Sequence, residues 1–272
     1  MDPAFLDVDG LRLPYWKTGR GPAVLLVHGN SASHRSYAHQ VADARLTQRC
    51  TLVTMDLAGH GIASRVEQDG SGGYSAALWV RGIVALARAV DARVLAGHSM
   101  GGHLSLEAMP QLPQVAGVAI FGTPPFGKPL QMDACYVDTQ PVVTWFTPHP
   151  APEALEAAAA TFVAPGNNVP PALLEDFRAT HPKVRADITS TLQAGEYEDE
   201  VTVVRNLRVP LAILHGAQDA LVSGRYLDEL QSPTLWRNKV QRIAAAGHLP
   251  HQEQPESFNK ILLDFLGDVL PA

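Results

Sequence analysis

The chain has 272 residues, of which 46% are hydrophobic and 18% charged, and its net charge is −6 at neutral pH. This composition suits one globular unit with a full core and room for an inserted subdomain. The acidic balance argues against a nucleic-acid-binding surface. The chain has no apolar run of the roughly 20 residues that a membrane helix needs, and the N-terminus does not resemble a signal peptide. We therefore expect a cytoplasmic protein that binds neither nucleic acid nor membrane; its oligomeric state stays open.

The first part of the chain alternates between short apolar runs and helix-like segments. The runs 5–8 and 11–17 flank Asp9-Gly10, a pair typical of a hairpin turn. Strands buried on both faces are predicted from the apolar runs at 23–27, 50–55, 92–96 and 115–121. Helices are predicted over 36–46, from Ser75 as N-cap to about 90, and over 103–109. The alternation predicts an α/β protein with a mostly parallel sheet and helices on both faces.

The pattern changes between residues 123 and 206, where strand alternation stops. Prolines punctuate the first third of this stretch, and helices are predicted near 153–163 and 171–180. We interpret residues 123–206 as a helical lid, inserted between the two parts of a core domain, 1–122 and 207–272. The acidic stretch from Glu196 to Glu200 is expected to be a solvated face.

Strand signals return after the predicted lid. Strands are predicted over 209–214 and 239–243. A closing helix follows, because one apolar face repeats at helical spacing through Phe258, Ile261, Leu262, Phe265 and Leu266. Cys50 lies in a predicted core strand, so a buried reduced thiol is expected there rather than a disulfide with Cys135.

The most informative stretch is Gly97-His98-Ser99-Met100-Gly101-Gly102, between a predicted strand and a predicted helix. This is the G-x-S-x-G arrangement of a nucleophile elbow. The flanking glycines let the backbone bend sharply, and the bend places the serine hydroxyl at the positive end of the helix. We expect Ser99 to be an attacking group.

A serine hydroxyl needs a base and a third group that orients the base. Asp219 and His248 follow two predicted parallel strands, so their loops leave the same sheet edge as Ser99. We expect His248 to move the proton and Asp219 to fix its tautomer. The backbone N–H groups of Met100 and Asn30 are the expected oxyanion hole.

At these residues the chain resembles the α/β-hydrolase fold family. The matching pieces keep the family's order and spacing over nearly the whole chain: 28–30, 56–61, 97–102, 215–219 and 247–253. The resemblance implies an eight-stranded, mostly parallel sheet with one antiparallel strand, and a lid after the sixth strand. Dehalogenases and epoxide hydrolases of this fold are expected to carry aspartate where this chain has Ser99.

The expected function is a serine hydrolase that cleaves small apolar carboxylic esters or lactones through an acyl-enzyme. The lid size and His28-Gly29-Asn30-Ser31 look similar to bacterial lactonases acting on acyl-homoserine lactones. Three alternatives stay open: a carbon–carbon bond hydrolase acting on aromatic ring-fission products, a cofactor-free quinolone dioxygenase, and a non-catalytic ligand receptor. The dioxygenase is disfavoured because Gly122-Thr123-Pro124-Pro125 has no carboxylate after the sixth strand. The receptor is disfavoured because all three triad residue types are present.

Several side chains have two interpretations. Trp145 and Phe146 either line an acyl pocket or pack the lid onto the core, and the same choice applies to His34 and Tyr37. Asp56, His28 and His98 are expected to have structural roles near the elbow. His248 and His251 lack the companions of a zinc motif, and no phosphate-loop motif is present, so no metal or cofactor is expected.

Overall fold

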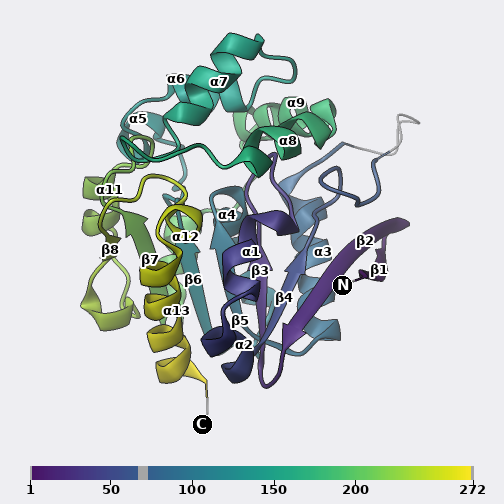
Figure 1. The fold of residues 1–272 in the computed structure, drawn as a ribbon, viewed down its shortest axis with the longest axis vertical. Helices are drawn as coiled ribbons and strands as arrows, with labels where there is room; N and C mark the ends of the chain where they lie inside the picture. Colours follow the sequence, from purple (N-terminus) through teal and green to yellow (C-terminus); the bar gives the residue numbers. More distant parts are fainter. Residues whose placement is uncertain (1, 67–72, 271–272) are drawn as a thin grey trace.

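The computed structural model describes residues 2–66 and 73–270, which form one eight-stranded sheet with helices on both faces (Figure 1). The strand order is β1-β2-β4-β3-β5-β6-β7-β8. The strands are β1 Ala4–Val8, β2 Leu11–Gly19, β3 Ala23–Val27, β4 Thr51–Met55, β5 Ala92–His98, β6 Gly117–Phe121, β7 Leu211–Gly216 and β8 Gln241–Ile243. The strand β2 pairs antiparallel with β1 and β4, and every other pairing is parallel. The predicted sheet, with its one reversed strand, is confirmed.

The local sequence signals explain this sheet. Asp9 and Gly10 both have positive φ, 51° and 78°, as the two central residues of a type I′ hairpin turn require. Every residue of β3, β6 and β7 is buried, because helices cover both faces of the sheet. This explains why these strands are continuous apolar runs in the sequence.

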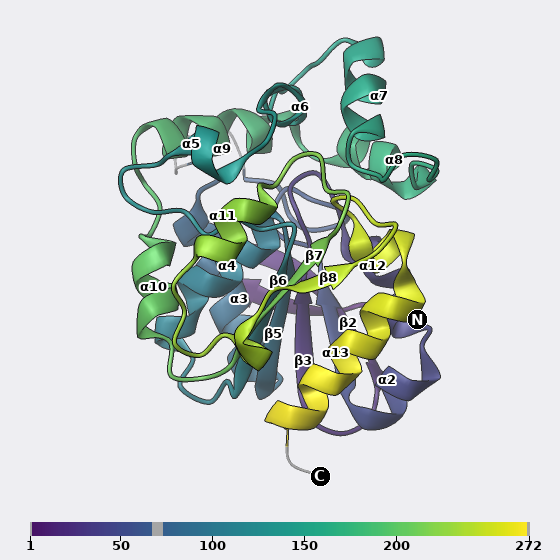
Figure 2. The ribbon, with the colours of Figure 1, turned by 90° about the vertical axis from the view of Figure 1, so that its left-hand side faces the viewer.

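The helices of the core pack on the two faces of the sheet (Figure 2). One face is covered by α3 (Ala76–Ala89), α4 (Met100–Ala108) and α10 (Glu200–Asn206), and the other by α2 (Ala44–Arg49) and α13 (Pro255–Val269). Shorter elements complete the core: α1 Ala38–Val41, α11 Gly224–Glu229, α12 Pro250–Glu253, and the 3₁₀ turns η1 His34–Tyr37, η2 Met109–Gln111 and η3 Trp236–Asn238.

Two predicted helices match the structure closely. Ser75 caps α3, and its side-chain oxygen accepts a hydrogen bond from the N–H of Leu78. The predicted apolar face of α13 is turned into the core, where Phe258, Phe265 and Leu266 are buried.

The single helix predicted over 36–46 is wrong, because the chain forms η1, α1 and α2 there. Asp43 separates the last two. Its carboxylate accepts hydrogen bonds from the N–H groups of Arg45 and Leu46, which starts a new helix instead of continuing the old one.

Residues 123–206 contain helices and no strand. They are α5 Met132–Cys135, α6 Gln140–Trp145, α7 Pro152–Ala160, α8 Pro171–Ala179, α9 Pro182–Gln193 and α10. The helices α5 to α9 lie over the edge of the sheet where β6 and β7 end, and α10 returns beside α4 (Figures 1 and 2). Only α7 and α8 correspond to helices predicted from the sequence.

The acidic stretch at the start of α10 is only partly the solvated face that the sequence predicts, because Glu196 and Glu198 are exposed but Glu200 is not. Glu200 is 1% exposed, and its carboxylate accepts hydrogen bonds from the N–H of Phe126 and from the ring of His103. Tyr197 is also buried. The stretch therefore attaches α10 to α4 and to the start of the inserted helices.

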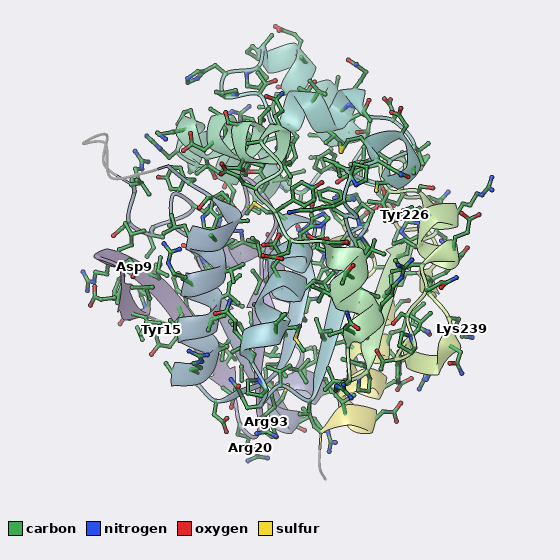
Figure 3. The ribbon with its side chains drawn as sticks, turned by 180° about the vertical axis from the view of Figure 1, so that it is seen from behind. Asp9, Tyr15, Arg20, Arg93, Tyr226 and Lys239 are labelled. Atoms are coloured by element: carbon green, nitrogen blue, oxygen red, sulfur yellow. The ribbon has the colours of Figure 1, made fainter. Side chains whose placement is uncertain are left out.

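The opposite edge of the sheet lies far from the inserted helices. Arg20 and Arg93 stand there, at the bottom of Figure 3.

Both cysteines, Cys50 and Cys135, are buried and free. Among the described residues, none of the helices combines the length and apolar character needed to cross a bilayer.

Candidate active site

Ser99 stands at the turn between β5 and α4, in a strained backbone conformation. Its φ is 50° and its ψ is −122°, a region that non-glycine residues rarely occupy. The turn is possible because Gly101 lies against β3: a Cβ there would overlap the carbonyl oxygens of Val27 and His28. A Cβ at Gly97 would overlap the carbonyl of Gly101. The two glycines permit this close approach, and Ser99 is presented at the N-terminus of α4.

Asp219 and His248 come together from the loops after β7 and β8. The Nδ1–H of His248 donates a hydrogen bond to Oδ2 of Asp219 over 3.1 Å. The other oxygen of Asp219 accepts from the N–H groups of Leu221 and Val222, at 2.8 and 3.0 Å. Burial alone would raise the pKa of Asp219, but the charge of His248 and these hydrogen bonds hold it below its ordinary value. Asp219 is thus an anion fixed behind the imidazole.

The imidazole of His248 lies beside the elbow. Its ring centroid is 5.1 Å from that of His98, the residue before Ser99. The Nε2–H of His98 donates to the carbonyl oxygen of His248 over 3.0 Å, and burial lowers the pKa of His98 to about 3. Ser99 and His248 line the same cavity. The structure of residues 2–66 and 73–270 has no hydrogen bond between these two side chains. Such bonds are often long before substrate binds.

Glu253 holds the His248 loop, a role that the sequence reasoning missed. Its Oε1 accepts hydrogen bonds from the N–H groups of Gly247 and Leu249, at 2.9 and 3.1 Å. Its Oε2 accepts from the N–H of Ala164 in the inserted segment, at 2.7 Å. One carboxylate therefore connects the histidine loop to the helices above it.

Asn30 and Met100, whose backbone N–H groups are the expected oxyanion donors, line the same cavity as Ser99. Met100 is the first residue of α4, so its N–H has no partner within the helix. Asn30 follows β3, and Trp145 of α6 donates its indole N–H to the Asn30 carbonyl oxygen over 3.2 Å. A helix of the inserted segment thus fixes the peptide that follows Asn30.

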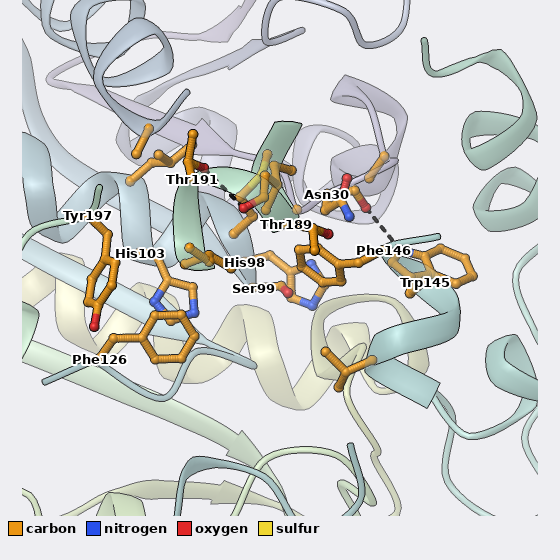
Figure 4. A pocket seen from close by; sticks show the side chains of 18 of the residues that line it. Asn30, His98, Ser99, His103, Phe126, Trp145, Phe146, Thr189, Thr191 and Tyr197 are labelled. Atoms are coloured by element: carbon orange, nitrogen blue, oxygen red, sulfur yellow. Dashed lines mark hydrogen bonds between the residues drawn. The ribbon is translucent and has the colours of Figure 1, made fainter. Parts of the chain in front are cut away.

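The cavity has a volume of about 680 Å³ and lies between α4 and the inserted helices. Figure 4 shows Ser99 near its centre, with Asn30 and Trp145 on one side and His103, Phe126 and Tyr197 on the other. Most of its lining is apolar, including Trp145 and Phe146, which the sequence left undecided between pocket and packing. Both line the cavity, and Trp145 also packs against Phe162 and Phe177.

His34 and Tyr37 do not line this cavity, which corrects their assignment as pocket residues. The N–H and Nδ1 of His34 bond to Oδ1 of Asp56, at 2.8 and 2.9 Å, and its ring stacks on Trp16. Tyr37 is fully buried and donates its hydroxyl to the carbonyl of Val27. Through these hydrogen bonds both side chains hold the loop that follows β3, at positions outside the cavity lining.

Asp56 and His28 occupy structural positions in this loop region. Besides His34, the carboxylate of Asp56 accepts from the N–H of Ile62 over 3.0 Å. Nε2 of His28 accepts from the N–H of Leu57 over 3.0 Å. Both side chains are fully buried and lie outside the cavity lining. Among the residues that the structure describes, no group of histidine, cysteine and carboxylate side chains has a metal-binding arrangement.

Comparisons with known proteins agree with this architecture. A family model described as the alpha/beta hydrolase family matches residues 24–261. An uncharacterized protein of Mycobacterium tuberculosis is 34% identical over 113 residues, which are 41% of this chain and 31% of that protein. The chain therefore matches about a third of the length of this curated relative.

Two solved structures share the fold over nearly their whole length. An N-acyl homoserine lactonase, AidH, in complex with N-butanoyl homoserine, is 22% identical with a TM-score of 0.91, over 100% of this chain and 98% of that chain. An esterase from Rhodococcus sp. ECU1013 is 24% identical with a TM-score of 0.79, over 99% and 100% of the two chains.

Proposed function

We propose that this chain, which belongs to the alpha/beta hydrolase family, is a serine hydrolase that cleaves small, mostly apolar carboxylic esters or lactones. One observation carries the proposal. A strained serine at an elbow faces an apolar cavity that is also lined by a histidine paired with a buried carboxylate. This is the arrangement that activates a serine hydroxyl for attack on a carbonyl carbon.

The proposed roles follow from the hydrogen bonds. The Nδ1–H of His248 is held by Asp219, so Nε2 is free to accept the Ser99 proton. The Ser99 oxygen then forms a bond to the substrate carbonyl carbon, and the carbonyl oxygen becomes an oxyanion. The N–H groups of Met100 and Asn30 would stabilise that charge. His248 returns the proton to the departing alcohol, and water releases the acid from the acyl-enzyme by the same route.

The apolar lining supports an apolar substrate arm. Leu104, Phe146 and Phe162 are among the side chains that face the cavity, so an alkyl or aryl group gains free energy by leaving water there. The likeness to a lactonase and an esterase supports both ring and open-chain esters as substrates. N-acyl homoserine lactones are a narrower candidate within this class, supported by the lactonase-like fold.

The test is Ser99→Ala, measured on p-nitrophenyl butyrate, together with labelling by a fluorophosphonate probe. The wild type is expected to hydrolyse the ester and to be labelled at Ser99. The variant is expected to lose at least about 10³-fold in kcat with an unchanged thermal transition. Ser190→Ala, at an exposed serine of α9, is the matched control and should keep full activity. Undiminished turnover in Ser99→Ala would overturn the proposal.

A further inference from the structure

One face of α4 lines the cavity from end to end. Met100, His103, Leu104 and Glu107 all contact it, at the i, i+3, i+4 and i+7 positions of the helix. Met100 is next to the nucleophile, and Glu107 is two helical turns further on, about 10 Å along the axis at 1.5 Å per residue. The helix therefore leads from the reacting serine to a buried carboxyl group.

Glu107 is a buried group whose hydrogen-bonding capacity is largely unused. Glu107 is only 8% exposed. Oε1 accepts one long hydrogen bond, 3.4 Å, from the N–H of Glu198, and Oε2 has no hydrogen-bond donor anywhere in 2–66 or 73–270. Glu107 lines the cavity and Oε2 is not among the fully buried unpartnered atoms, so a donor on a ligand can reach it from the cavity in place of water.

The groups around Glu107 are mainly acidic. Glu200 lies on α10 and is occupied by His103 and by the N–H of Phe126. Glu196 also lines this end of the cavity, at its exposed rim. His103 is the one basic side chain among the described residues that line this end. Together these groups disfavour an anion at this end and favour a donor or a cation.

The acid–base behaviour of Glu107 fits such a ligand. Burial, followed by the nearby charge of Glu200, raises the pKa of Glu107 to about 7. The hydrogen bond from the N–H of Glu198 and the charge of His103 lower this pKa, and the charge of Glu198 raises it by a smaller amount. The carboxyl group is therefore mostly neutral below pH 7 and mostly an anion above it.

We propose that Glu107 forms a specificity subsite for a hydrogen-bond-donating group, best a protonated amine, at the distal end of the substrate arm. The inference rests on the proposed function, because it places the ester carbonyl at Ser99 and runs the arm along α4. An extended chain advances about 1.3 Å per bond, so an arm of about eight carbons spans the distance to Glu107. The cavity thus selects an amphipathic arm, apolar along its length and polar at its tip.

The test compares p-nitrophenyl octanoate with p-nitrophenyl 8-aminooctanoate. The measured quantity is the ratio of kcat/KM for the amino ester to kcat/KM for the plain ester. In Glu107→Gln this ratio should fall about tenfold or more, because a hydrogen bond to a charged group is lost. In the wild type the ratio should rise between pH 6 and pH 8 as Glu107 ionises, and the variant should lack this rise. The amine stays protonated over this range.

Glu153→Gln is the matched control, since it removes an exposed carboxylate on α7 that does not line the cavity. Its ratio should equal that of the wild type. A ratio that is the same in wild type and Glu107→Gln, at all pH values, would overturn the subsite.

A binding measurement separates this inference from the proposed function. Titration calorimetry on the Ser99→Ala protein should give tighter binding for 8-aminooctanamide than for octanamide, and Glu107→Gln should remove the difference. This readout does not need turnover. If the plain ester is hydrolysed but the two amides bind equally, the subsite is wrong and the hydrolase stands. If the two amides bind differently but Ser99 is neither labelled by the probe nor needed for turnover, the subsite stands and the proposed hydrolase mechanism is wrong.

Discussion

The indole N–H of Trp145 donates to the carbonyl oxygen of Asn30 over 3.2 Å, so a helix of the inserted segment holds the loop proposed to bind the oxyanion. A second connection reaches the same loop. Arg185 of α9 donates to the hydroxyl of Ser31 over 3.2 Å, and that hydroxyl donates to Oδ1 of Asn30 over 3.1 Å. The inserted helices therefore position Asn30 as well as cover the cavity.

Trp145→Phe should lower kcat more than it raises KM. The phenyl ring keeps most of the packing against Phe162 and Phe177, but the donor to Asn30 is lost. A misplaced oxyanion donor weakens binding of the transition state, and about a tenfold fall in kcat is expected. Steady-state kinetics on p-nitrophenyl butyrate check this. A change confined to KM would mean that Trp145 only lines the cavity.

Arg185→Met should destabilise the fold. Arg185 is 2% exposed and has no carboxylate within ion-pair distance in the described part of the chain. Its guanidinium donates to the carbonyl oxygens of Thr147, Phe177 and Pro148. Methionine leaves these acceptors unsatisfied, which should cost about 2 kcal/mol of the free energy of unfolding in urea. Arg205→Gln, at an exposed site of α10, should change it by less than about 0.5 kcal/mol.

Asp219→Asn and Asp56→Asn should separate chemistry from structure. The first removes the anion behind His248, so kcat should fall by about 10⁴ with little change in stability. In Asp56 the two oxygens accept from different backbone N–H groups, Oδ1 from His34 and Oδ2 from Ile62, so the single oxygen of Asn leaves one of them without its acceptor and stability should fall more than kcat. In Asp219 one oxygen accepts from both backbone N–H groups, so the Asn oxygen can keep both bonds. Kinetics and urea unfolding of both variants provide the comparison. The opposite pattern would assign the catalytic acid to Asp56.

Stability should fall as the pH falls below about 6.5, and His60 should contribute to that fall. Burial, with the charge of His28, lowers the pKa of His60 to about 3. Between these pH values the unfolded chain binds a proton that the folded protein does not, so the free energy of unfolding decreases by about 1.4 kcal/mol per pH unit from this group. Urea unfolding at pH 6.5 and 5 should show a shallower slope for His60→Asn. The exposed His149→Asn should keep the wild-type slope.

The sequence predicts those parts of the structure whose signals are local. Asp9-Gly10, Ser75 and the glycines around Ser99 each determine the backbone within a few residues of themselves. The sheet follows because buried parallel strands must be apolar throughout. Ser99, Asp219 and His248 could be placed at one edge because the carboxyl ends of parallel strands lie together there.

The missed features depend on partners far away in the chain. Glu200 looks like part of a solvated acidic run, yet its partner His103 is 97 residues away. Nothing in the sequence around Arg185 distinguishes it from an ordinary charged residue on a helix surface, and its hydrogen bond to Ser31 forms only in the folded chain. His34 and Tyr37 follow Asn30 closely, but a 3₁₀ turn directs them toward Asp56 and Val27 instead of the cavity. Contacts of this kind leave no periodic pattern in a single sequence.

The strands β6 and β7 lie next to each other in the sheet, although a long stretch of chain separates them. Their pairing, Val118 opposite Leu211, involves no residue of the intervening helices. The hydrogen-bonded register of these two strands is therefore set without the length or composition of that stretch. A graft of this continuous piece would alter which molecules the protein accepts, while the strands that carry Ser99, Asp219 and His248 keep their neighbours.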